Sequence, residues 1–171
     1  MICNLLMFYK NYFHEIYVIS PTINSDDKWD YIKKQPLIIE NKPLKRWMAE
    51  EKRKRDGAFK GEIVAKPPVS LEGVEGQKNT NEKDYFDGLI PEENFISEDY
   101  NPADFMKIIQ NKKAIVTALK RHGKPKYLAD RTLFIFDDQV GSPMFRGSNG
   151  NEFKAFCTKH RYFFISYFLI L

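Results

Sequence analysis

The chain has 171 residues, 43% of them hydrophobic and 15% aromatic, which supplies a core for one ordinary domain and excludes global disorder. Its formal net charge of +4 does not by itself indicate a nucleic-acid partner. Cys3 and Cys157 lack the spacing of a disulfide framework or a zinc site and are typical of free thiols in a reducing compartment. His14, His122 and His160 are scattered, which argues against a histidine metal centre.

The charges are distributed in blocks along the sequence. Residues 42–66 hold nine basic and four acidic residues, residues 72–104 two basic and ten acidic, and residues 107–131 eight basic and one acidic. Such blocks are most often solvated surfaces, and less often a surface that binds a polyanion.

Near the N-terminus, apolar residues recur at helical spacing and predict a helix over residues 2–13. The stripe consists of Ile2, Leu5, Leu6, Tyr9, Tyr12 and Phe13. No capping residue precedes this stripe, so we expect a helix whose beginning is missing. The segment also has neither a basic leader nor a small-residue cleavage site, so we do not expect a signal peptide. The apolar run at residues 16–19, closed by Pro21, predicts a buried strand followed by a loop.

Residues 35–101 form the least regular part of the sequence, with five of the nine prolines. We expect a poorly ordered, charged insertion within a single domain of residues 1–171. The charged stretch at residues 46–57 suits a short surface helix, and the polar, Gly-bearing stretch at residues 72–84 is typical of a mobile loop.

A second amphipathic helix is predicted over residues 101–123. Asn101 is a suitable N-cap, Pro102 suits the first helical position and Gly123 suits the end. The expected buried side chains are Phe105, Ile108, Ile109, Val116 and Leu119.

Three further elements follow. Residues 132–136 predict a buried strand, residues 151–160 a modest helix with Phe153 and Phe156 inward, and residues 162–171 a strand buried on both faces that is too short to span a membrane. Apolar strands separated by helices predict a three-layer α/β fold with a parallel sheet and one long insertion.

Two adjacent acids, Asp137 and Asp138, directly follow the strand at residues 132–136. In parallel α/β sheets, ligands bind beyond the carboxyl ends of the strands. Adjacent residues that leave a strand point in different directions, so one carboxylate can hold Mg²⁺ while the other orients a water or accepts its proton. The alternative is a pair of solvated loop aspartates, one of which caps a turn.

Several motifs resemble a known family. The stretch "YKNYFHEIYVISPTINSDDKWDYI", the stretch "FDGLIPEENF" and the segment from "LFIFDDQVGSP" to the C-terminus are similar to the core of poxvirus-type DNA-packaging ATPases, in the FtsK/HerA branch of P-loop NTPases. The resemblance covers about residues 4–33 and 84–171. It implies an ATPase core that binds ATP and Mg²⁺, double-stranded DNA as a partner, a homo-oligomeric, hexameric ring and no membrane. A cytoplasmic location, including viral replication sites if the protein is viral, follows from the same resemblance.

The resemblance also implies roles for three residues. Asp137 matches the Walker B acid on the Mg²⁺ side, and Asp138 matches the acid that activates water, where the wider superfamily more often has Glu. Arg161 matches a basic position proposed to act as an arginine finger on the nucleotide of a neighbouring subunit, because a planar cation stabilises charge on a γ-phosphate. The alternative for Arg161 is a surface residue ahead of a strand.

The sequence departs from this family at the phosphate-binding loop. The pattern G-x-x-x-x-G-K-[ST] occurs nowhere; the only Gly-Lys pair is Gly123-Lys124, and Ala118 occupies the position of the earlier Gly. In the family the loop would directly precede the first helix, and a polar sensor residue would follow the last strand. We therefore expect the interior of an ATPase domain, cut at both ends, with an exposed apolar sheet edge and no activity on its own.

Two other functions remain open. The first is an inactive remnant that binds nucleic acid or a full-length ATPase through "KRWMAEEKRKR" and "KRHGKPKY", with Trp47 and Tyr127 stacking on bases. The second is a metal-dependent nuclease that uses Asp137, Asp138 and a third acid, Asp26 or Asp27.

Overall fold

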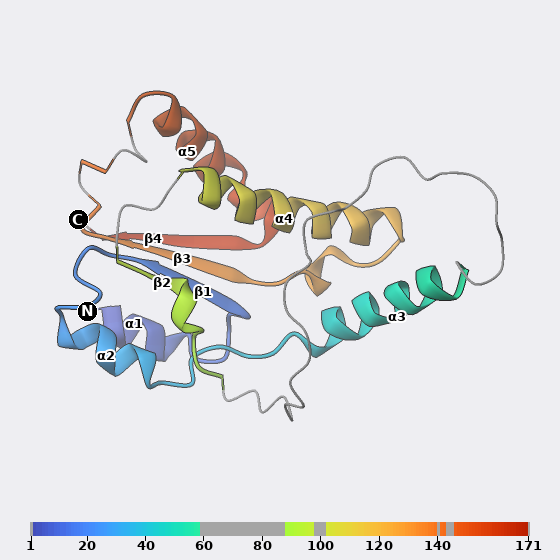
Figure 1. Ribbon diagram of the computed structural model, residues 1–171, viewed down its shortest axis with the longest axis horizontal. Coiled ribbons are helices and arrows are strands. Elements are labelled where there is room, and N and C mark those ends of the chain that lie inside the picture. The colour runs from blue at the N-terminus through green and yellow to red at the C-terminus, as the bar shows by residue number, and fades with distance from the viewer. Residues whose placement is uncertain (1, 59–87, 98–101, 140, 143–145, 171) are drawn as a thin grey trace.

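The computed structural model describes residues 2–58, 88–97, 102–139, 141–142 and 146–170 (Figure 1). Four parallel strands form one sheet in the order β2-β1-β3-β4. Their bounds are Glu15–Ile19 for β1, Phe95–Ile96 for β2, Thr132–Asp137 for β3 and Ile165–Ile170 for β4. The predicted α/β class with a parallel sheet is confirmed.

Helices cover both faces of the sheet, which gives three layers (Figure 1). Helices α1 (Ile2–Phe8) and α2 (Asp27–Lys33) cover one face, and α4 (Pro102–Arg121) and α5 (Gly147–Lys159) cover the other. Helix α3 (Lys42–Ala58) lies beside the C-terminal end of α4. Short 3-10 turns are η1 (Glu92–Asn94), η2 (Lys126–Leu128) and η4 (His160–Phe163).

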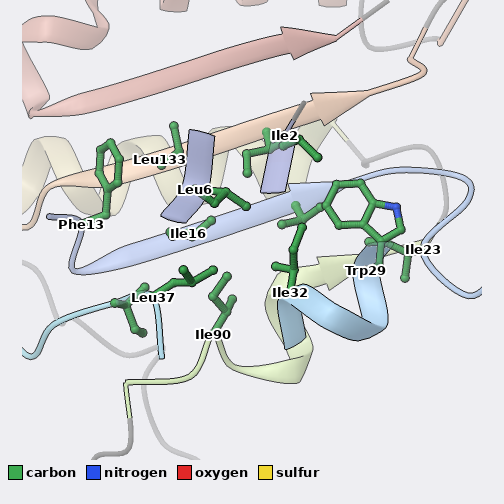
Figure 2. Packing of buried hydrophobic residues seen from close by; sticks show 13 residues of the cluster. Ile2, Leu6, Phe13, Ile16, Ile23, Trp29, Ile32, Leu37, Ile90 and Leu133 are labelled. Atoms are coloured by element: carbon green, nitrogen blue, oxygen red, sulfur yellow. The ribbon is translucent and has the colours of Figure 1, made fainter. Parts of the chain in front are cut away.

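The central strand β3 is buried along its whole length. Since successive side chains of a strand point to opposite faces, Leu133 and Ile135 pack with α1 and α2, whereas Phe134 and Phe136 pack with α4 and α5. Figure 2 shows the first of these clusters, in which Leu133 lies close to Leu6 of α1. Burial of each large side chain contributes about 1.5–3 kcal/mol, so this apolar run holds both helical layers on the sheet.

The first helix is shorter than predicted. Helix α1 ends at Phe8, and the chain turns at Asn11, which has a left-handed φ of 60° and donates its backbone N–H to the carbonyl of Leu37. Asn tolerates this conformation well. Phe13 is still buried, but Tyr12 is 50% exposed, so the helical stripe does not continue to the end of the predicted segment.

Parts of the predicted insertion at residues 35–101 belong to the fold. Leu37, Ile38 and Ile90 are buried in the hydrophobic cluster that contains α1 and α2. Strand β2, which the sequence did not predict, pairs in parallel with β1. The predicted surface helix exists as the longer α3. The predicted loop at residues 72–84 and the proposed cap Asn101 lie outside the described residues.

Helix α4 agrees with its prediction. Phe105, Ile109, Val116 and Leu119 are buried as predicted, whereas Ile108 is only partly buried, and Lys120 and Arg121 occupy the last turn. The helix ends at Arg121, and the turn after it contains Gly123, whose φ of +64° suits a residue without a Cβ.

The prediction for the last strand was wrong in one respect. Strand β4 lies at an edge of the sheet and is only partly buried, with Leu169 45% exposed. The composition of this segment indicates a strand, but it does not show whether the strand lies at the edge or in the middle of the sheet. Among the helices in the described part of the chain, none combines the length and hydrophobicity that a membrane crossing requires.

Candidate functional site at the carboxyl edge of the sheet

The parallel register brings Ser20 and Asp137 together. Ile19 of β1 is paired with Phe136 of β3, so the residue that follows each of them lies at the same carboxyl edge. The Ser20 hydroxyl donates a hydrogen bond of 2.9 Å to Oδ2 of Asp137, and both residues are buried. Ser20 Oγ also lies 3.0 Å from Thr22 Oγ1. The edge therefore presents a carboxylate and two hydroxyls at one point.

A lysine holds the buried acid. Lys28 Nζ lies 3.1 Å from Oδ2 of Asp137 and 2.9 Å from Oδ2 of Asp26. Lys28 stands in the first turn of α2, and Asp26 is the N-cap whose side chain accepts a hydrogen bond from the Lys28 backbone N–H. Asp26 thus caps the start of α2 and also forms an ion pair with the ammonium group of Lys28. A cation supplied by the chain itself balances the charge at the end of β3.

The contacts between Lys28 and the carboxylates shift the pKa values of Lys28 and Asp26. Burial lowers the pKa of Lys28, but the hydrogen bonds to Asp26 and Asp137 outweigh it, so the pKa of Lys28 is raised from its ordinary value. The hydrogen bond from the Lys28 side chain lowers the pKa of Asp26. Lys28 and Asp26 are therefore both charged across the physiological range and form an ion pair.

The two adjacent acids have different environments. Asp137 is 6% exposed and ends the strand, whereas Asp138 is exposed and adopts a left-handed φ of 51°. The Asp138 backbone N–H donates to the carbonyl of Ile170 at 3.1 Å, which ties this turn to the end of β4. The expected divergence of the two side chains is seen: Asp137 joins the Ser20–Lys28 cluster, and Asp138 faces solvent.

The oxygen donors at this edge suit a hard cation. Carboxylate and hydroxyl oxygens are ligands that Mg²⁺ accepts, and Mg²⁺ often takes only one or two protein carboxylates together with water and phosphate oxygens. Within the described residues, no group of three His, Cys, Asp or Glu side chains is arranged to hold a metal ion. Asp137 and Asp26 fit the protein side of a magnesium site if Lys28 moves away, but the sequence contains no glycine loop for the phosphates.

No protein-family model, curated protein or solved structure is similar to this chain.

The structure does not bring Arg161 to the two acids. Arg161 is exposed in η4, directly before β4, and therefore lies at the amino edge of the sheet. The six residues of β4 separate the two edges by roughly 16 Å at about 3.3 Å per residue. Within one chain Arg161 cannot act at Asp137, so the predicted finger requires a neighbouring subunit. Asp27, the other proposed third acid, is exposed in the first turn of α2.

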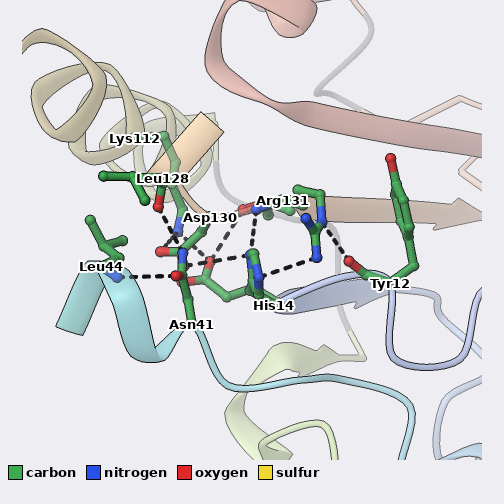
Figure 3. Close-up of polar contacts among 10 residues, drawn as sticks. Tyr12, His14, Asn41, Leu44, Lys112, Leu128, Asp130 and Arg131 are labelled. Carbon is green, nitrogen blue, oxygen red and sulfur yellow. Dashed lines mark hydrogen bonds and ion pairs between the residues drawn. The ribbon is translucent and has the colours of Figure 1, made fainter. Parts of the chain in front are cut away.

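A second polar cluster lies at the amino edge of the same two strands (Figure 3). Lys112 of α4 pairs with Glu15 at the start of β1 and with Asp130 before β3, and its side chain is only 8% exposed. Asn41 donates to Asp130 at 3.0 Å, and His14 accepts from the backbone N–H of Arg131 at 2.9 Å (Figure 3). These contacts join four segments of the chain.

The sequence reasoning missed two residues of the carboxyl-edge site. Ser20 was detectable in principle, because it follows the apolar run of β1 as Asp137 follows that of β3. Lys28 carried no comparable signal, since the sequence "SDDKWD" does not show which way a lysine in the first turn of a short helix extends. Because residues 28 and 137 are far apart in the sequence, their contact cannot be recognised without the structure.

Proposed function

We propose that the carboxyl edge of β1 and β3 is the magnesium side of an ATP-hydrolysing site, in a domain related to DNA-packaging motors. The observation that carries this proposal is the buried Asp137 carboxylate at the end of the central parallel strand, hydrogen-bonded to Ser20 of the neighbouring strand. Ligands of parallel α/β folds bind at this edge. The function of a motor, with double-stranded DNA as substrate and a homo-oligomeric ring in the cytoplasm, belongs to the same proposal.

Each residue of the site has a role in this proposal. Asp137 holds Mg²⁺, with Ser20 close enough to orient its carboxylate. Asp138, exposed beside it, orients the attacking water. With a metal ion held by Asp137, Lys28 would no longer pair with this carboxylate, and its ammonium group would be available for phosphate oxygens. Arg161 of a neighbouring subunit supplies the cation for the γ-phosphate.

The chain by itself is expected to bind nucleotide weakly. The backbone N–H groups of a glycine loop provide most of the contacts with the β- and γ-phosphates in P-loop sites, and the sequence has no such loop. We therefore expect metal and nucleotide to bind to the present chain with measurable coupling but without turnover.

Linkage between metal and nucleotide tests the proposal. Mn²⁺ binding, followed by electron paramagnetic resonance, is measured with and without a non-hydrolysable ATP analogue in the wild type and in Asp137→Asn. If both ligands share the site, the analogue tightens Mn²⁺ binding to the protein, and Mn²⁺ tightens binding of the analogue by the same factor. Asp137→Asn is expected to abolish this coupling.

The matched control is Asp130→Asn, which removes a carboxylate at the other edge of the sheet. Its coupling is expected to equal that of the wild type, provided that circular dichroism shows a folded chain. Equal coupling in Asp137→Asn and the wild type, or nucleotide binding that ignores the metal, would contradict the proposal.

One observation favours a second function, metal-dependent cleavage of phosphodiester bonds. Asp26 and Asp137 both contact Lys28, so two carboxylates and a lysine converge at one point. Two carboxylates can hold a metal that activates water, and a lysine stabilises the charge on the phosphate. Of the acids predicted to act with Asp137, Asp26 therefore takes the place of Asp138 as the second acid, and Asp27 is not needed. Mg²⁺-dependent cleavage of DNA without ATP, lost in Asp26→Asn as well as Asp137→Asn, would favour this function over the ATPase.

A further inference from the structure

Two basic segments far apart in the sequence meet beside the amino edge of the sheet. The described part of α3 contains seven lysines and arginines from Lys42 onward, and the end of α4 with the following turn adds Lys120, Arg121, Lys124 and Lys126. The α3 acids are fewer, namely Glu50, Glu51 and Asp56. These two segments therefore carry a strong positive excess, although the whole chain has a net charge of only +4.

A groove runs between these segments. Its volume is about 400 Å³, and Lys42 and Arg46 of α3 and Lys124 of the turn line it together with Glu50. Its apolar floor includes Trp47 and Leu128. Three cations from two separate segments thus border one concave surface.

The relative position of the two segments is fixed by the fold. Asn41 caps α3 by accepting a hydrogen bond of 3.1 Å from the Leu44 N–H, and its amide donates to the Leu128 carbonyl at 2.9 Å. Leu44 and Trp47 pack against Val116 and Leu119 of α4 in a separate cluster. The groove is therefore formed in the free chain, which reduces the entropy lost when a ligand binds.

Within the described residues, two of the three cations form no close ion pair, although the charge of Lys42 lowers the pKa of Glu40 and that of Lys124 lowers the pKa of Glu51, each as a minor cause beside a closer lysine. Arg46 pairs with Glu50 at 3.2 Å, and Lys54 and His122 lie near Glu51. The ion pairs within the described residues include neither Lys42 nor Lys124, and both residues are exposed. These ammonium groups carry charge that a ligand can neutralise.

We propose that this groove and the basic residues around it bind the phosphate backbone of a nucleic acid without sequence preference. Lys42, Arg46 and Arg53 recur at i, i+4 and i+11 and share one face of α3. They extend about 16 Å along the helix axis, a length over which one strand of a duplex places about five phosphates. A single small phosphate would use only the groove, so the extended charge favours a polymer.

Base stacking contributes little to this surface. Trp47 was proposed to stack on bases, but it is 9% exposed and packs in the cluster with α4, so that role is wrong. Tyr127, which directly precedes the groove residue Leu128 in the sequence, is 71% exposed and can contact a ligand. Binding through charge alone predicts similar affinity for different sequences and a steep dependence on salt.

The test measures binding of fluorescent 20-base-pair DNA of two unrelated sequences, without nucleotide or magnesium, at several salt concentrations. The triple variant Lys42→Ala, Arg46→Ala, Lys124→Ala is compared with the control triple Lys34→Ala, Lys154→Ala, Lys159→Ala. The control removes the same charge from exposed positions on and beside α2 and α5. We expect the groove triple to bind about tenfold more weakly or worse at 0.1 M salt, with a salt slope smaller by about 2–3, and the control triple to change little.

The same assay separates this inference from the proposed function. Asp137→Asn is expected to bind DNA as the wild type does, because the inference does not depend on the carboxyl-edge site. Equal losses in the two triples would overturn it, and so would the absence of DNA binding by the wild type at low salt. Tighter binding to polyglutamate or to anionic lipid vesicles than to DNA would also overturn it, because the surface would then serve another polyanion.

Discussion

The two ends of the β1–β3 pair each hold a lysine between two carboxylates, but the environments differ. At the amino edge, Lys112 is 8% exposed in its side chain and contacts Glu15 and Asp130. At the carboxyl edge, Lys28 is 30% exposed in its side chain and bridges Asp26 and Asp137. The buried lysine holds elements of the fold together, whereas the half-exposed lysine can exchange with a ligand.

The surroundings of the two lysines explain this difference. Lys112 belongs to the middle of the 20-residue α4, and Asp130 also accepts from Asn41, the cap of α3. Lys28 belongs to the first turn of the seven-residue α2. A side chain at the start of a short surface helix moves at lower cost than one packed between two helices and a sheet.

The largest expected effect is the loss of the buried lysine. Lys112→Met leaves Glu15 and Asp130 without their cation in a buried site, and we expect the free energy of unfolding to fall by about 3–5 kcal/mol. Urea denaturation measures this change. Lys113→Met, at the exposed next position of α4, is the control and should stay within about 0.5 kcal/mol. Equal effects of the two substitutions would show that the amino-edge cluster is not structural.

A smaller effect is expected at the carboxyl edge. Lys28→Met leaves Asp137 without its ion-pair partner, and the free energy of unfolding should fall by about 1–3 kcal/mol, with part of the loss restored by Mg²⁺. Thermal unfolding with and without Mg²⁺ measures both changes. The double variant Lys28→Met, Asp137→Asn should show no restoration. Restoration that persists in the double variant would place the ion elsewhere.

The pH dependence of stability distinguishes the amino edge further. Burial first, and then the positive charge of Arg131, lowers the pKa of His14 below its ordinary value of 6.5. The folded chain therefore favours neutral His14, which accepts from the Arg131 backbone N–H, and the unfolded chain binds a proton more readily. Stability should be complete above about pH 6.5 and decrease as the pH falls towards the lowered pKa.

The neighbours of His14 do not reverse this direction. Asp130 lies 3.8 Å from Nδ1 and raises the pKa, but burial and Arg131 outweigh it. Urea denaturation between pH 7.5 and 5 on the wild type and on His14→Gln tests the prediction. The wild type should lose more stability than the variant over this range. Parallel curves for the two proteins would assign the pH dependence to other groups.

The smallest effect is expected for the second acid of the pair. Asp138 is exposed, and its side chain is separate from the Ser20–Lys28 cluster, so Asp138→Asn should change the free energy of unfolding by less than about 0.5 kcal/mol. Mg²⁺ should stabilise this variant as it does the wild type. If Asp138→Asn and Asp137→Asn instead lose metal binding equally, the two acids form one site, contrary to the geometry.

The sequence predicted the elements whose signals are local. The apolar run of β3 and the 3.6-residue period of α4 both gave the correct element, and the acids after β3 led to the correct edge of the sheet. Strand β2 was missed because a strand of two residues, Phe95 and Ile96, is too short to show a periodic pattern. The exposure of β4 depends on its position in the sheet, which its own residues do not encode.

The site was less predictable than the fold. Asp137 is identifiable from the end of a strand, but its contacts with Ser20 and Lys28 join residues that are more than 100 positions apart in the sequence. Trp47 shows the same limit, because a tryptophan in a charged helix looks available for bases until the packing of α3 on α4 is known.

Calorimetric titration of Mg²⁺ into the wild type, Lys28→Met and Asp137→Asn is the most direct test of the claim that Lys28 occupies the place of a divalent cation. We expect Lys28→Met to bind Mg²⁺ more tightly than the wild type, because a competing charge is gone, and Asp137→Asn to bind it more weakly than either. The same affinity in all three proteins would contradict the claim.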